Sequence, residues 1–265
     1  MKQGKSKTKK RLPLITSRKL TVATFRAYKA NWRLYMLIVA VIVLPINLLS
    51  LSQRLATDLS FNAYASIASL FMNIALIYAG VRLADGKPKP TIRQAYYDGT
   101  ASTVRFVIAT AALLVMMVPF AIGGVVSSFA TSDYGVSAPL GEQIILNGVA
   151  WLIAFVSFWW LTRWGLSVYA VVQDGATPGR ALKLARRLTL RRFWRVLGRV
   201  MFMLVIVAAT ALLFSVPIFG LSLVYHNQAA LTALYRTPAL TVILPFFHLY
   251  LLGLYRNLKE TAETV

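Results

Sequence analysis

The chain has 265 residues, of which 58% are hydrophobic, and its mean hydropathy is +0.63, whereas soluble domains are roughly 45–50% apolar. Its 29 basic and 8 acidic residues would indicate a nucleic-acid partner in a soluble protein. The absence of Cys excludes disulfides, thiolate nucleophiles and Cys-ligated metals. Because the apolar residues gather in runs of the roughly 17–25 residues that cross a bilayer, we predict an all-α polytopic membrane protein. The basic excess then indicates the positive-inside bias of cytoplasmic loops.

In chain order, residues 1–18 are expected to form a basic cytoplasmic tail and residues 19–33 a short amphipathic helix. A further helix is expected over 91–105, and the helix of the fourth span is expected to continue through 164–172. A single six-span domain is expected over 19–257, followed by a short cytoplasmic tail, 258–265. The spans are predicted at about 34–51, 62–82, 106–128, 143–163, 200–223 and 238–255.

The basic residues also predict the orientation of the chain. All of them except Arg54 and Arg236 lie in the N-terminal segment, in the segments 82–105 and 163–199, or at the C-terminal end. With six spans, these regions share one side of the membrane. Since Lys and Arg are enriched in cytoplasmic loops, both termini are expected in the cytoplasm.

Three segments share a plan: a stretch that begins with Thr, an Arg at the membrane edge, and a span with Pro in its outer half. They run from Thr21 to Pro45, from Thr91 to Pro119 and from Thr177 to Pro217. A second span completes each segment, so a true threefold repeat would be parallel, with its pseudo-symmetry axis along the membrane normal. The alternative is the weak similarity that any six-span protein shows where its chain enters the membrane.

The three prolines are predicted to kink their spans, because Pro removes a helical hydrogen bond and clashes with the preceding turn. Kinks at equivalent depths could open a shared cavity, or they could only improve packing. Polar residues within the spans could line such a cavity or form ordinary hydrogen bonds between helices. The residues concerned are Pro45, Pro119 and Pro217 for the kinks, and Asn47, Asn73, Asn147 and His248 for the cavity.

Residues 180–199, RALKLARRLTLRRFWRVLGR, hold eight basic residues and no acidic one, directly before an apolar run. On a helix, Ala181, Leu184, Ala185 and Leu188 form one apolar stripe, with most of the cations opposite. We expect this stripe in the acyl boundary and the cations toward lipid phosphates. A purely topogenic role and a specific phosphate site between helices are the alternatives. The residues expected to contact lipid headgroups are Arg180, Lys183, Arg187, Arg191, Arg192, Trp194 and Arg195.

Two further expectations concern arginines in and near this stretch. Arg191, Arg195 and Arg199 are spaced by four residues and are expected to line one helix face. Arg163, which follows the pair Trp159-Trp160, is expected to snorkel at the cytoplasmic membrane edge.

Residues 166–198, LSVYAVVQDGATPGRALKLARRLTLRRFWRVLG, resemble a hallmark of prokaryotic six-span membrane proteins similar to the membrane domain of glycerophosphoryl diester phosphodiesterase. The departures are Ala185 and Arg186, where Ser and Trp are usual. The resemblance implies a helical domain of a prokaryotic cytoplasmic membrane, without an established activity. The catalytic part of the phosphodiesterase is a separate soluble barrel, and no such segment is present here. The matching residues are Arg163, Asp174, Gly175, Pro178, Ala181, Leu182, Leu188, Thr189, Arg192, Phe193, Trp194, Arg195, Leu197 and Gly198.

Patterns typical of enzymes are nearly absent from the sequence. The two His residues have no metal-ligand spacing, the eight acidic residues are scattered, and no Gly-rich phosphate loop is present. We therefore expect no enzyme activity and no cofactor. The expected role is membrane-organising or scaffolding, with a cationic cytoplasmic face that contacts anionic membrane lipids. The sequence indicates no nucleic-acid partner and names no protein partner. The alternative is a small-molecule or lipid transporter with a cavity among the Pro-kinked spans.

The predicted orientation can be tested by labelling, because a chain without Cys accepts single cysteines for membrane-impermeant reagents. A Cys at Lys87 is expected to react only from the cytoplasmic side, and a Cys at Ser137 only from the outer side. Labelling of position 87 from outside would overturn the topology.

Overall fold

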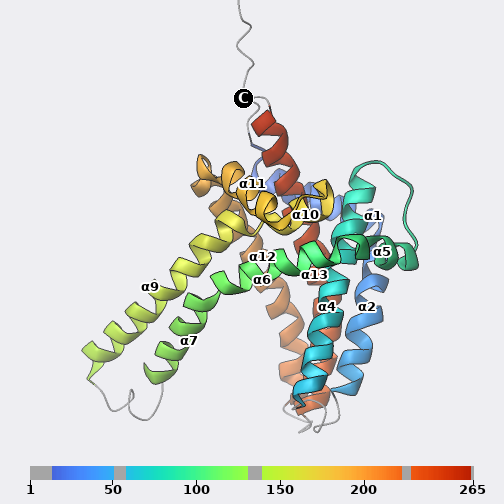
Figure 1. The fold of residues 1–265 in the computed structure, drawn as a ribbon. Helices are drawn as coiled ribbons and strands as arrows, with labels where there is room; N and C mark the ends of the chain where they lie inside the picture. Colours follow the sequence, from blue (N-terminus) through green and yellow to red (C-terminus); the bar gives the residue numbers. More distant parts are fainter. Residues whose placement is uncertain (1–13, 51–57, 131–138, 223–227, 264–265) are drawn as a thin grey trace, which may run out of the picture. The chain divides into compact units, whose positions relative to one another are not determined.

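The computed structural model of the chain describes residues 14–50, 58–130, 139–222 and 228–263. Every regular element in these ranges is helical. Six helical stretches among them are long and apolar enough to cross a membrane (Figure 1). The prediction of an all-α polytopic membrane protein is therefore confirmed.

The chain divides into two compact units. The single six-span domain expected over 19–257 stays a prediction. The first unit combines the residues up to Thr103 with those from Gly198 onward, and the second unit is Val104–Leu197. One boundary between the units falls at the start of α6 (Thr103–Met116) and the other inside the long helix α12 (Phe193–Ser222), so hydropathy alone gives no sign of either.

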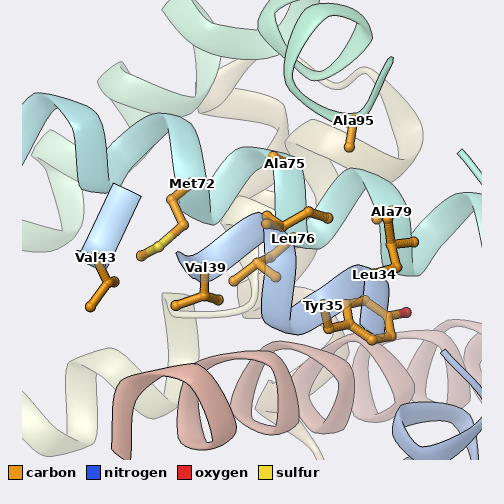
Figure 2. Close-up of a cluster of buried hydrophobic side chains, with 10 residues drawn as sticks. Leu34, Tyr35, Val39, Val43, Met72, Ala75, Leu76, Ala79 and Ala95 are labelled. Atoms are coloured by element: carbon orange, nitrogen blue, oxygen red, sulfur yellow. The ribbon is translucent and has the colours of Figure 1, made fainter. Parts of the chain in front are cut away.

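The core of the first unit lies between α2 (Trp32–Leu49) and α4 (Leu59–Ala84), which pack against α13 (Gln228–Glu263) (Figure 1). Small residues bring these helices close together. A Cβ on Gly80 of α4 would lie 3.0 Å from a Leu252 side-chain carbon of α13. The buried cluster of Leu34, Tyr35, Ile38, Val39 and Val43 of α2, Met72, Ala75, Leu76 and Ala79 of α4, and Ala95 is shown in Figure 2.

The last helix is longer than predicted at both ends. α13 begins at Gln228, before the span expected from residue 238, and continues to Glu263, through the described part of the expected tail. Leu258 and Thr261 are each only 1% exposed. The described residues after 257 are therefore helical because they pack, although most of them are polar like those of a tail.

Three shorter helices precede spans, and each has Thr at its N-cap. They are α1 (Ser17–Ala30), α5 (Ile92–Gly99) and α11 (Pro178–Leu190), here called the Thr-capped helices. The three N-cap residues have almost the same extended backbone, with ψ of 151°, 161° and 150°. The residues four and eight positions after each Thr are buried. These pairs are Leu20 and Thr24 after Thr16, Ala95 and Gly99 after Thr91, and Ala181 and Ala185 after Thr177.

The starts of the Thr-capped helices can be compared with the starts of the three predicted repeat segments. In the first segment, the residue that matches Thr91 and Thr177 is Thr16, whereas the sequence pattern placed the start at Thr21. With this shift, all three helices bury the same two positions. The common burial supports a threefold repeat, which stays a prediction.

A guanidinium group also holds the turn before each Thr-capped helix. Arg199 Nε donates to the Ile15 carbonyl at 2.9 Å, one residue before Thr16. Arg82 Nε donates to the Pro88 carbonyl at 3.2 Å, three residues before Thr91. Arg105 Nη1 donates to the Gly175 carbonyl at 2.6 Å, two residues before Thr177. These turns therefore have donors for carbonyls that no helix satisfies.

Among the three prolines, the helix is interrupted only near Pro119. Pro45 and Pro217 lie inside helices that run on to Leu49 and Ser222. Near Pro119, α6 (Thr103–Met116) ends and α7 (Val118–Ala130) begins, because the proline ring clashes with the preceding turn. The N–H of Phe120 donates instead to the Ser157 hydroxyl of α9 (Leu140–Trp164) at 2.8 Å. A backbone group freed by the break thus has a partner from a neighbouring helix.

In the second unit, α7 and α9 form a closely packed hairpin (Figure 1). A Cβ on Gly123 of α7 would lie only 2.6 Å from the Ala150 carbonyl oxygen of α9. Both helices also expose large apolar side chains, with exposed fractions of 63% for Phe129, 71% for Ile144 and 75% for Trp151. Such surface is typical of helices that lipid covers.

The hairpin supplies a matched pair of substitutions. Gly123→Ala is expected to lower the free energy of unfolding by about 1–3 kcal/mol, because the added methyl group clashes with the Ala150 carbonyl. Gly124→Ala, where a Cβ meets nothing within 4 Å, is expected to be neutral or slightly stabilising. Thermal unfolding followed by circular dichroism in micelles measures both. Equal midpoints for the two variants would contradict the close approach.

Candidate functional site

The basic stretch lies on the second unit as far as Leu197, and the start of α11 is fixed by the turn before it. The helix expected to continue from the fourth span breaks at Gly165, and α10 (Ser167–Asp174) is a separate helix. A Cβ on Gly165 would lie 2.5 Å from the Leu161 carbonyl oxygen. α10 ends at Gly175, whose φ of 61° lies in the left-handed region that favours glycine. The contact from Arg105 to this residue holds the start of α11.

The predicted amphipathic helix forms as α11, but its apolar stripe is covered by protein. Ala181 and Ala185 are fully buried and Leu188 is 7% exposed, because α11 packs against α9 and α10. The expectation that this stripe lies in the acyl boundary is therefore wrong. Spacing predicted which face is apolar, but it could not show whether lipid or protein covers that face. The cations of the opposite face, Arg180, Lys183, Arg186 and Arg187, are exposed as expected.

The chain turns at Arg191 and Arg192, so the arginines beyond α11 do not line one helix face. Arg199 departs furthest from the expectation. It is 7% exposed, belongs to the first unit and donates to Ile15, while its own carbonyl accepts from the Tyr250 hydroxyl at 3.1 Å. The shared face of Arg191, Arg195 and Arg199 was therefore predicted wrongly, since the four-residue spacing spans a break in the helix.

Exposed aromatic and apolar residues accompany the cations where α12 begins. Trp194 is 75% exposed and Leu190 is 50% exposed, next to the exposed Arg195 and Arg191. Trp194 packs edge-on against Phe193, with ring centroids 5.4 Å apart. An exposed tryptophan beside arginines is typical of a membrane–water interface.

A similar aromatic–cation pair begins α2. Trp32 is 46% exposed, and the guanidinium carbon of Arg33 lies 5.5 Å from its ring centroid. Two helices that follow Thr-capped helices thus start with an exposed Trp-Arg pair.

Few carboxylates accompany the basic surface. In the first unit, Asp98 pairs with Arg82 at 3.6 Å, and Asp85 pairs with both Lys87 and Arg256. In the part of the second unit that the structure describes, Arg180, Lys183, Arg186, Arg187 and Arg191 take part in no ion pair. These cations are available to anions outside the protein.

Arg163, at the end of α9, lies against aromatic rings. Its guanidinium carbon is 4.0 Å from the ring centroid of Trp159 and 5.7 Å from that of Phe193. These two rings meet edge to face at 6.3 Å. The guanidinium therefore lies on the face of Trp159, one helical turn earlier, and makes cation–π contacts.

Thr189 connects α11 to the end of α9 at Arg163. Its hydroxyl is buried, 3.2 Å from the Arg163 carbonyl oxygen and 3.0 Å from that of Ala185. Trp159 and Thr189 were not predicted as site residues. The spacing of four between Trp159 and Arg163 could have indicated the first, because such residues are neighbours on a helix. The contact of Thr189 depends on tertiary packing.

The polar residues of the spans make separate local hydrogen bonds. Asn73 and His248 share a hydrogen bond of 3.0 Å, and Asn47 donates to Thr237 at 2.8 Å, both within the first unit. Asn147 lies in the second unit and donates to the Gln143 carbonyl of its own helix at 2.9 Å. Each of the four candidates for a cavity thus has a partner, which favours structural roles.

The described ranges contain no group of three His, Asp or Glu residues that could hold a metal ion.

No family model matches the chain, and neither a curated protein nor a solved structure matches it. The geometry of the site therefore has to carry the functional inference.

The Asn73–His248 pair can be tested with a double-mutant cycle. Asn73→Leu and His248→Leu are each expected to lower the free energy of unfolding by about 1 kcal/mol, because each removes the hydrogen bond that joins α4 to α13. The double variant is expected to lose less than the sum, with a coupling of about 0.6–1.7 kcal/mol. Asn147→Leu, which removes a contact within one helix, is the control and is expected to show no coupling with either. Additive losses for Asn73 and His248 would contradict the pairing.

Proposed function

We propose that this integral membrane protein has a non-catalytic, membrane-organising or scaffold role, and that its basic surface binds anionic lipid headgroups. The observation that carries the proposal is the exposed row of α11 cations, which have no carboxylate partner among the described residues, followed by the exposed Trp194. Cations attract lipid phosphates, and Trp anchors at headgroup depth. Both features are needed for a surface that lies against a bilayer.

The proposed location is a prokaryotic cytoplasmic membrane, with both termini and the basic surface in the cytoplasm. The distribution of Lys and Arg supports this orientation. The resemblance to the six-span membrane domain supports the prokaryotic source. Of the residues that carry it, Arg163 contacts both Thr189 and Phe193, so this part of the motif corresponds to a packed structural element.

The basic surface could also be topogenic only, without a preference for particular lipids. The exposed Trp194 favours binding, because a purely topogenic segment needs positive charge but no exposed aromatic anchor. The transporter alternative has less support. Asn47 is paired with Thr237 and Asn73 with His248, and Asn147 is bonded within its own helix.

The proposal predicts lipid selectivity that depends on charge. Arg180→Gln, Lys183→Gln and Arg187→Gln together are expected to lower the preference for phosphatidylglycerol over phosphatidylcholine several-fold. Each cation near an anionic surface contributes about 1 kcal/mol, or about fivefold, and salt reduces this. Spin-labelled lipids in bilayers that contain the full chain measure the preference.

The matched control keeps the charge of the same face. Arg180→Lys with Arg187→Lys is expected to retain most of the preference, because exposed cations act mainly as point charges toward a lipid surface. An unchanged preference in the triple Gln variant would leave the basic surface as a topogenic feature only.

A further inference from the structure

One cation of the second unit is neither exposed like the α11 cations nor paired. The Nε atom of Arg163 is buried and has no hydrogen-bond partner. In the described ranges, the guanidinium of Arg163 takes part in no ion pair and donates no hydrogen bond. A charge taken out of water without an anion is destabilising. Cation–π contact with Trp159 offsets only part of this effect.

The surroundings of Arg163 restrict which anion could reach it. Trp159 and Phe193 cover the guanidinium with apolar rings, and Trp160 and Trp164 follow on the same helix end. The Thr189 hydroxyl is already directed at carbonyl oxygens. The site therefore offers one planar cation with N–H donors and otherwise apolar walls. A small hydrated anion gains little binding free energy from apolar walls. An anion with an attached apolar group gains binding free energy from both the cation and the walls.

The position of Arg163 along its helix points to the same ligand. It lies near the end of α9, after an apolar run that can cross the membrane, and among tryptophans that mark headgroup depth. A guanidinium binds phosphate with two parallel N–H donors, which a lysine cannot do.

We propose that Arg163, held between Trp159 and Phe193, is a specific binding site for the phosphate of one anionic phospholipid. The proposal rests on the proposed function, since it requires this end of α9 to lie at the lipid headgroups. It goes further by distinguishing a single site from the general attraction of the α11 cations. Binding at the half-buried Arg163 is expected to resist salt, whereas attraction by exposed cations is screened.

The test is native mass spectrometry of the full chain in detergent, titrated with dioctanoyl-phosphatidylglycerol, dioctanoyl-phosphatidylcholine or inorganic phosphate. One molecule of dioctanoyl-phosphatidylglycerol is expected to bind per chain, and the complex is expected to survive added salt. Arg163→Met is expected to weaken binding about tenfold or more, because a charge-assisted bidentate contact is lost. Arg163→Lys is expected to weaken it less.

Matched variants separate the site from its neighbours. Trp159→Leu removes the ring under the guanidinium and is expected to weaken binding several-fold. Trp160→Leu removes an equal ring that packs on Trp164 instead, at 6.4 Å, and is expected to leave affinity unchanged. Arg180→Gln, on the exposed face of α11, is also expected to leave the single site intact. If Arg163→Met fails to fold, Arg163→Lys and Trp159→Leu still decide the question.

Three results would overturn the proposal. Unchanged affinity in both Arg163→Lys and Trp159→Leu would remove the site. Equal binding of dioctanoyl-phosphatidylcholine would show that the lipid's net charge is not recognised. Inorganic phosphate that binds as tightly as the lipid would assign the site to a free anion. Each result is independent of the lipid preference measured with the α11 variants, so failure of this site is distinguishable from failure of the proposed function.

Discussion

The Thr-capped helices depend on one kind of contact, an arginine guanidinium that donates to a backbone carbonyl in the preceding turn. Arg82, Arg105 and Arg199 provide it for α5, α11 and α1. Helix ends and turns leave carbonyls without helical donors, and water is scarce beside a hydrocarbon layer. Arginine suits this place because it is always charged and has several donors in a fixed plane. Part of the basic excess is therefore structural, although the same residues also belong to the segments from which the orientation of the chain is predicted.

The cations of the chain fall into groups with different physical roles. Arg199 is buried and satisfies a backbone carbonyl, so its removal would expose an unsatisfied group. Arg180 and Lys183 are exposed and act at long range through their charge. Arg163 lies between these limits, half-buried on an aromatic face. A count of basic residues treats all of them alike, whereas burial and partners distinguish them.

The spans and the buried face of α11 could be predicted because both depend on local hydrophobic period. Ala181, Ala185 and Leu188 recur at helical spacing, and burial follows from that spacing whatever covers the face. The long-range contacts could not be predicted in this way. The first Thr-capped helix has Thr16 at its N-cap, and not Thr21 as the sequence pattern suggested. Arg199, which is distant in sequence, donates to the turn just before Thr16. The segment that contains Leu258 and Thr261 has the composition of a polar tail, and only the burial of these two residues shows that it packs. Within the site, Trp159 and Arg163 are close in sequence and could be foreseen, whereas Thr189 could not.

The way the first unit joins the two ends of the chain has a consequence for biosynthesis. The backbone N–H of Ile15 donates to the side chain of Asn257 at 3.1 Å, across a sequence separation of 242 residues. Leu20 of α1 lies against Gly253 of α13, again near the end of the chain. The second unit, in contrast, is one continuous stretch, and its α7–α9 hairpin is closed by residues that leave the ribosome within a short interval. Domains form in the order in which their residues become available. The middle of this protein can therefore assemble first, and its first helix must wait for its last before it acquires its native neighbours.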